Sequence, residues 1–80
     1  MIYHYTKFAE DKFFILHKHG RQVFKEDINA LVKSPEKIEK KYNLCFAEGI
    51  LISTKEKWQV VHEQDDGVIK ILTFYPLSEG

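Results

Sequence analysis

The sequence predicts an α+β domain in which two N-terminal helices pack on one face of a three- to four-stranded antiparallel sheet. Two observations lead to this prediction. Residues 1–41 place apolar side chains at three- and four-residue spacings among many Lys and Glu, which is typical of amphipathic helices. Residues 42–76 instead hold β-branched and aromatic runs that turn signals interrupt. Helices followed by consecutive strands are typical of the α+β class.

Length and composition favour one folded domain over residues 1–80. Hydrophobic residues make up 44% of the chain, with six Phe, four Tyr and one Trp, which argues against intrinsic disorder. Twelve Lys and Arg balance twelve Asp and Glu, so no broad positive field exists and we expect no tight binding to duplex DNA. A single Cys and the lack of a long apolar run lead us to expect a cytoplasmic protein without membrane contact.

The first helix is predicted from Thr6 to about His19, after a short apolar start at residues 2–5. The side chain of Thr6 can cap the free amides of the first turn. Gly20 follows where a left-handed residue commonly ends a helix. The predicted apolar face of this helix consists of Phe8, Ala9, Phe13, Ile15 and Leu16.

The second helix is predicted to begin at Lys25 and to stop at Ser34-Pro35, because the residue before Pro is pushed out of the helical region. Phe24 would be an N-cap without a side-chain oxygen. Val23 and Ile28 fit a hydrophobic staple around that cap. The core-facing residues of this helix are predicted to be Ile28, Leu31 and Val32.

The sheet begins with an ambiguous segment. Residues 37–42 alternate as an exposed edge strand blunted by lysines would, but they also suit a short helix. Residues 44–53 are mostly apolar, and Gly49 within them indicates either a bulge or a close approach of the backbone.

A hairpin of residues 58–63 and 68–75 is the strongest strand signal, because Asp66-Gly67 suits a two-residue turn with positive φ. Such a turn places Glu63 opposite Lys70, Val61 opposite Leu72 and Trp58 opposite Tyr75, whereas a three-residue loop would shift one strand by a position. One face of the hairpin would then carry Trp58, Val60, His62, Ile71, Thr73 and Tyr75.

Few side chains indicate chemistry. His62 and Tyr75 on one face could serve acid–base chemistry on a ribose hydroxyl, although a structural Tyr at the core edge is the favoured alternative. Arg21, the sole Arg, could bind an anion or, as we favour, pair locally with Glu26 or Asp27. The four His lack metal-binding spacing and Cys45 lies among apolar neighbours, so we expect no metal site and no cofactor.

Six short motifs, spread along residues 5–76, carry a resemblance to a known family. They are Thr6-Lys7, His19-Gly20, residues 25–28, Ser34-Pro35, Val60-Val61-His62 and Thr73-Phe74-Tyr75-Pro76. In this order and spacing the chain resembles a small prokaryotic domain family of the RelE/ParE toxin superfamily. It departs from that family at Phe8, where members tend to have His, and in its neutral charge.

The resemblance implies the RelE/ParE-like fold and a toxin-like protein of a toxin–antitoxin type system, or a degenerate relative, acting on RNA or the translation apparatus. Its partners would be an antitoxin protein and RNA or the ribosome. If the chain cleaves RNA, we expect Arg21 and Lys70 to contact phosphate, and His62 with Tyr75 to transfer protons.

The alternative is a non-enzymatic protein-interaction module that works as a homodimer or with a partner protein. Neutral charge and the lack of the first-turn His favour this alternative. We predict that the protein dimerises or binds a partner through its sheet, because two short helices cover one face and leave at least one strand edge unpaired. The open face is predicted to carry an apolar patch of Trp58, Val60, Ile71 and Tyr75.

Overall fold

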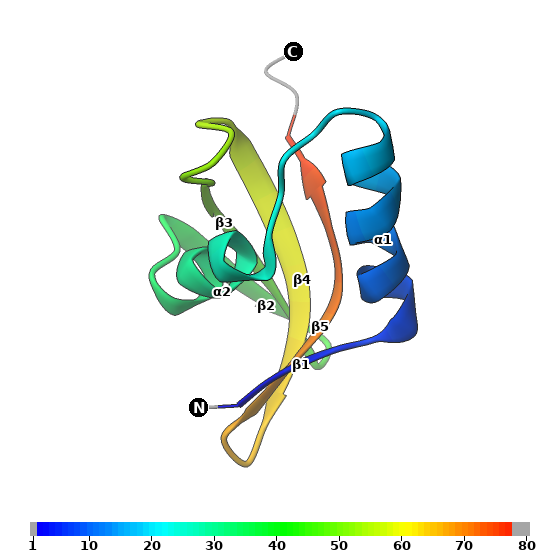
Figure 1. Ribbon diagram of the computed structural model, residues 1–80. Coiled ribbons are helices and arrows are strands. Elements are labelled where there is room, and N and C mark those ends of the chain that lie inside the picture. Colours follow the sequence, from blue (N-terminus) through cyan, green and yellow to red (C-terminus); the bar gives the residue numbers. More distant parts are fainter. Residues whose placement is uncertain (1, 78–80) are drawn as a thin grey trace.

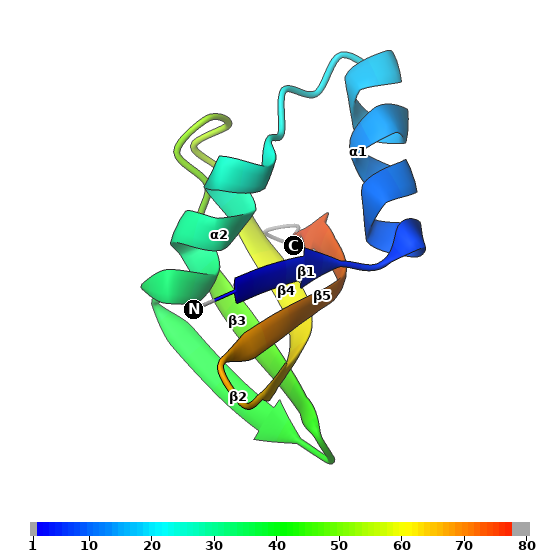
Figure 2. The same cartoon turned by 60° about the horizontal axis from the view of Figure 1, so that its bottom comes forward.

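The computed structural model describes residues 2–77, which form two helices and a five-stranded mixed sheet (Figures 1 and 2). In chain order the elements are β1 (Ile2–Tyr5), α1 (Lys7–Lys18), α2 (Lys25–Lys33), β2 (Lys37–Lys41), β3 (Leu44–Ile50), β4 (Lys57–Asp65) and β5 (Val68–Pro76). The strand order is β1-β5-β4-β3-β2, so β1 and β2 are the two edges of the sheet. The α+β class is confirmed.

The prediction of three or four antiparallel strands is wrong, because the short apolar start of the chain is itself a strand. β1 pairs parallel with β5, from Ile2 opposite Val68 to Tyr5 opposite Ile71, and the other neighbouring strands are antiparallel. This pairing joins residues 66 positions apart in sequence. A local pattern contains no information about such a distant partner, and four residues are too few to show a clear period.

Both predicted helices form, with the expected ends. The Thr6 hydroxyl accepts a hydrogen bond from the Ala9 amide at 3.1 Å and so caps α1. Phe24 is the N-cap of α2 without a side-chain acceptor, and the Asp27 carboxylate instead accepts from the Phe24 amide at 3.0 Å. α1 buries only Ala9 completely, and its predicted apolar face is too wide because Phe8 and Ile15 are exposed.

The ambiguous segment is the edge strand β2, which pairs with β3 from Lys37 opposite Glu48 to Lys41 opposite Leu44. In β3 the register passes Gly49 without a bulge, opposite Trp58. A Cβ atom at Gly49 would lie 3.2 Å from Cγ of Leu31 in α2. The predicted bulge is therefore absent from β3 at this position, and the tight approach is made by the Leu31 side chain, while the nearest backbone atom, the Glu36 amide nitrogen, is 3.7 Å from the same Cβ position.

The β4–β5 hairpin has the predicted turn, with φ of 46° at Asp66 and 78° at Gly67. Glu63 lies opposite Lys70 as predicted. Beyond this point the register shifts, so that His62 faces Ile71 but Val61 faces Thr73. Leu72 is thus an extra residue, a β-bulge.

The bulge overturns the predicted pairs at the far end of the hairpin. Val61 does not face Leu72, and Trp58 faces Pro76 instead of Tyr75. Because side chains alternate between faces, one extra residue moves every later side chain of β5 to the opposite face. Phe74 therefore enters the core, and Tyr75 leaves the face that carries His62.

Both helices cover the same face of the sheet, α2 over β3 and β4 and α1 along β5 and β1 (Figure 2). The core between the layers is built from Ala9, Val23, Ile28, Leu31, Val32, Ala47, Leu51, Trp58, Val60, Ile69, Ile71 and Phe74. The predicted open patch is wrong, since Trp58, Val60 and Ile71 are fully buried under the helices. Local sequence does not show which sheet face the helices will cover, and here they cover the more apolar one.

Candidate functional site

His62 is a core residue. Its side chain is 1% exposed in β4, opposite Cys45 of β3 and Ile71 of β5. Neither ring nitrogen has a hydrogen-bond partner among the described residues. Burial lowers the pKa of His62, and the nearby backbone of Glu63 partly opposes this shift. The imidazole is therefore neutral near pH 7 and out of reach of a substrate hydroxyl.

Tyr75 lies on the other face of the sheet from His62. It is opposite Gln59, whose position in β4 is three residues from His62, and its hydroxyl accepts a hydrogen bond from the Gln59 side-chain amide. The ammonium group of Lys12 lies 5.7 Å from the centre of the Tyr75 ring. The structure therefore does not bring the two predicted proton-transfer residues together, because of the bulge at Leu72.

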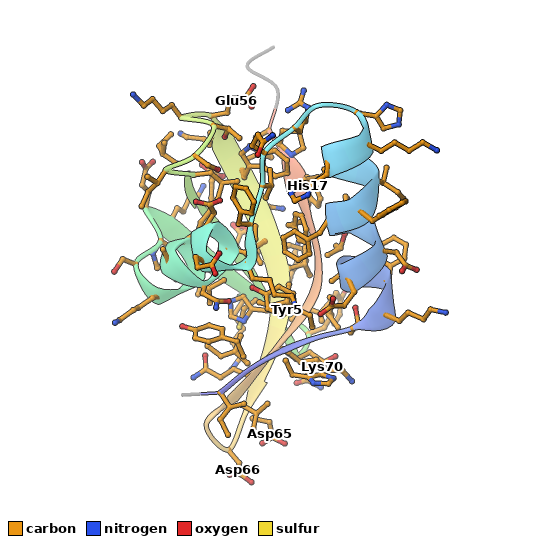
Figure 3. The ribbon with its side chains drawn as sticks, viewed as in Figure 1. Tyr5, His17, Glu56, Asp65, Asp66 and Lys70 are labelled. Carbon is orange, nitrogen blue, oxygen red and sulfur yellow. The ribbon has the colours of Figure 1, made fainter. Side chains whose placement is uncertain are left out.

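The two predicted phosphate contacts also lie apart. Arg21 forms an exposed ion pair with Glu56 at 3.2 Å, in place of the predicted local pair with Glu26 or Asp27. Glu56 directly precedes β4, whereas Lys70 lies opposite Glu63 near the far end of that strand (Figure 3). Glu63 is seven positions after Glu56 along extended chain, which corresponds to about 23 Å.

No assembled metal site is seen in residues 2–77, where no group of three or more His, Cys, Asp and Glu side chains could hold an ion. His17 has a structural contact, since its Nε2 lies 2.9 Å from the Val23 carbonyl oxygen. Cys45 is a buried free thiol, as its apolar neighbours predicted. Cys45 lies directly opposite the buried His62, but in residues 2–77 the two do not belong to a group of three or more side chains that could hold a metal ion.

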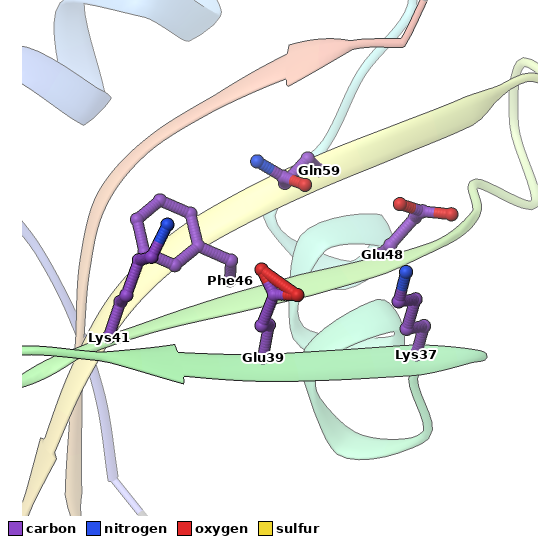
Figure 4. A pocket seen from close by; sticks show the side chains of 6 residues that line it. All are labelled: Lys37, Glu39, Lys41, Phe46, Glu48 and Gln59. Carbon is purple, nitrogen blue, oxygen red and sulfur yellow. The ribbon is translucent and has the colours of Figure 1, made fainter.

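The helix-free face of the sheet holds a shallow hollow of about 320 Å³ beside the β2 edge (Figure 4). Its lining residues are Lys37, Glu39, Lys41, Phe46, Glu48 and Gln59. Charges of both signs from β2 and β3 surround the ring of Phe46 there. Such a lining suits contact with a mixed-charge protein surface better than a polyanion, which would need one sign of charge.

The β2 edge is the most accessible backbone of the sheet. All five of its residues are exposed, and among residues 2–77 it has a neighbouring strand on one side only. Ile38 is 55% exposed, and Tyr42 in the following turn is 92% exposed with a φ of 55°. At an edge, every second residue directs its backbone N–H and C=O away from the sheet, where another strand can pair with them.

The opposite edge of the sheet, β1, is less suited to pairing with a partner strand. β1 is four residues long, and the hydroxyl of its Tyr5 donates to the Lys25 carbonyl and the Asn29 side chain, which ties the strand to α2. Beyond β1, α1 lies along β5. The alternation of residues 37–42 predicted this exposed edge strand, with a short helix as the alternative, and the structure confirms the strand.

Helix α1 also carries exposed apolar side chains. Phe8, Phe14 and Ile15 are each more than half exposed on α1. No helix in residues 2–77 is long and apolar enough to cross a membrane.

Comparisons with protein-family models, curated proteins and solved structures gave no match to this chain. The five-stranded mixed sheet, with β1 ahead of the helices, also differs from the RelE/ParE-like arrangement that the resemblance implied. The toxin function implied by the resemblance stays a prediction.

Proposed function

We propose that this protein is a non-enzymatic protein-interaction module that binds an extended segment of a protein partner along the edge of β2. The observation that carries the proposal is that all five residues of β2 are exposed at an edge with a free pairing side. An added strand obtains its affinity from main-chain hydrogen bonds and its specificity from alternate side chains. β2 provides both.

The side chains of β2 fit this mode of binding. Lys37, Glu39 and Lys41 lie on the helix-free face over the hollow, and Ile38 with Lys40 lies on the other face. A partner strand would meet alternating charges on one face and an apolar residue beside a cation on the other. That pattern selects among partner sequences by charge complementarity.

The positions of the predicted catalytic residues weigh against an RNA-cleaving toxin. His62 is buried, Tyr75 lies on the opposite face, and Arg21 is paired with Glu56 far from Lys70. The zero net charge also gives little attraction to RNA. The toxin hypothesis, with its antitoxin and ribosomal partners, rests on the resemblance alone.

Site-specific photo-crosslinking in cells tests the proposal. The photoreactive residue p-benzoylphenylalanine replaces Ile38 in one variant and Phe14 in a matched control, since both side chains are apolar and mostly exposed. We expect a protein adduct of defined mass from position 38 and none of that mass from position 14. Adding Lys40→Pro should abolish the adduct, because Lys40 alternates with Glu39 and directs its backbone N–H away from β3, so Pro removes a donor from the free side of the strand.

Three results would contradict the proposal. They are adducts to nucleic acid at position 38, the same protein adduct at both positions, and the lack of any protein adduct at position 38. Growth arrest on induced expression, relieved by Arg21→Ala or Tyr75→Phe in folded protein, would instead support the toxin hypothesis.

A further inference from the structure

Residues 36–40 read Glu-Lys-Ile-Glu-Lys, a sequence whose charges invert when it is read backwards. When two copies of this strand pair antiparallel with Ile38 opposite Ile38, each charged residue of one copy therefore lies opposite a residue of the other charge in the second copy. The pairs are Glu36 with Lys40 and Lys37 with Glu39, each occurring twice, and Ile38 with its own copy. Opposite charges and apolar pairs directly across a sheet are the favourable combinations.

We propose that the occupant of the β2 edge is a second copy of this chain, paired antiparallel about Ile38. This inference rests on the proposed function, because it names the partner of the same edge. The two five-stranded sheets would then continue into one another across a two-fold axis perpendicular to the sheet. Each copy would satisfy the free backbone groups of the other.

Geometry limits the registers to a few. Directly opposite residues of antiparallel strands point to the same face of a sheet. If the axis is perpendicular to the sheet, both copies keep the same face on the same side. One residue must then lie opposite its own copy at the axis. Centring on Glu39 opposes two Glu39 carboxylates and places Lys37 against Lys41 twice. Like charges directly opposite are destabilising, so this register is disfavoured.

The other neighbouring registers are no better. Centring on Lys37 opposes two ammonium groups and brings Glu39 against Pro35, which lacks a backbone donor. Centring on Lys40 opposes two ammonium groups and needs Tyr42, whose positive φ lies outside strand geometry. Only the register centred on Ile38 leaves no like charges opposed.

The surroundings of β2 leave this register accessible. α2 packs over β3 and β4, and Ile38 remains 55% exposed on the helix side of the sheet. Glu36 has a competing contact with Lys57, but the two charged groups are 3.8 Å apart and the side chains of Lys57 and Glu36 are 35% and 54% exposed, so that contact is weak. In Figure 2, β2 runs along an uncovered border of the sheet.

The interface is small, because it consists mainly of five residues from each copy. Interfaces of this size belong to the weak and transient class, so the association should be measured up to about 1 mM protein. The molar mass by light scattering should rise from 9.5 kDa towards twice that value with concentration. Added salt should weaken the rise, since the ion pairs are exposed.

Paired charge reversals test the register. Lys37→Glu alone places Glu against Glu39 twice, and Glu39→Lys alone places Lys against Lys37 twice. Each variant should raise the dissociation constant at least about tenfold. A mixture of the two variants should restore association, because every opposed pair between them is again Glu with Lys. Lys41→Glu, the matched control on the same strand and face, lies opposite Pro35 in this register and should not weaken association.

A symmetric cross-link provides a second measurement that does not depend on affinity. Ile38→Cys in a Cys45→Ala background should oxidise to a disulfide-linked dimer, because directly opposite residues are about 4.5–5.5 Å apart at Cα. Glu39→Cys in the same background should not, because residue 39 lies opposite residue 37 of the other copy, which makes the two copies of residue 39 diagonal neighbours about 7–8 Å apart.

Several outcomes would overturn the inference. They are a constant 9.5 kDa mass up to about 1 mM, tighter association of Lys37→Glu, a mixture of folded variants that stays monomeric, and faster cross-linking at position 39 than at position 38. A monomer whose position 38 captures a different protein would refute self-pairing and leave the proposed function intact.

Discussion

Replacement of His62 by Leu should stabilise this protein, although His62 was the leading candidate for acid–base chemistry. The ring is 1% exposed and neither of its nitrogens has a partner among the described residues. A buried polar group without a hydrogen bond costs about 1–3 kcal/mol. Leu fills a similar volume, and after allowance for imperfect fit we expect the free energy of unfolding at pH 7.5 to rise by about 1 kcal/mol.

The pH dependence of stability gives the same substitution a second signature. Burial places the pKa of folded His62 below the ordinary value of 6.5, so the unfolded chain binds more protons in this range. The stability contributed by the neutral ring is complete above about pH 6.5 and is lost as the pH falls. The free energy of unfolding should therefore drop by up to about 1.4 kcal/mol per pH unit from this group alone.

Urea denaturation of the wild type, His62→Leu and His62→Gln between about pH 7.5 and pH 5 separates the two effects. Both variants should lose this part of the acid-side slope, because neither side chain titrates. Only His62→Leu should gain stability at pH 7.5, because Gln keeps buried polar atoms. A loss of stability in His62→Leu at pH 7.5, or a wild-type slope in both variants, would refute the reasoning.

Three further predictions concern packing, capping and nucleic acid. Gly49→Ala should lower the free energy of unfolding by about 1 kcal/mol in urea denaturation, because its Cβ would lie 3.2 Å from Cγ of the buried Leu31. Unchanged stability would show that α2 can shift to accommodate the Cβ without loss of free energy. Thr6→Ala should cost about 1 kcal/mol in the same assay through loss of the hydrogen bond to the Ala9 amide, and a loss below 0.3 kcal/mol or so would show that the cap is dispensable. A titration with duplex DNA near 150 mM salt should give no submicromolar complex, since the net charge is zero, and such a complex would contradict the charge argument.

The elements that the sequence predicted correctly are those whose signals are local. Thr6 and Gly20 delimit the first helix, and Pro35 ends the second, because each acts on the backbone within a few residues of itself. Asp66-Gly67 makes the predicted turn because both residues accept positive φ. The pairing of Glu63 with Lys70 followed, since it lies close to that turn.

The candidate site depended on distant positions, and there the tertiary structure decided. Whether Tyr75 shares a face with His62 depends on one extra residue at Leu72, which the pattern of alternating side chains does not show. Whether residues 2–5 form a strand depends on β5 arriving beside them. Whether Trp58 faces helices or solvent depends on which face the two helices cover. These outcomes are set by contacts between residues far apart in the chain. The charge symmetry of residues 36–40, in contrast, is a property of the sequence alone. Only the structure shows that these residues lie at an exposed sheet edge, where that symmetry can direct pairing.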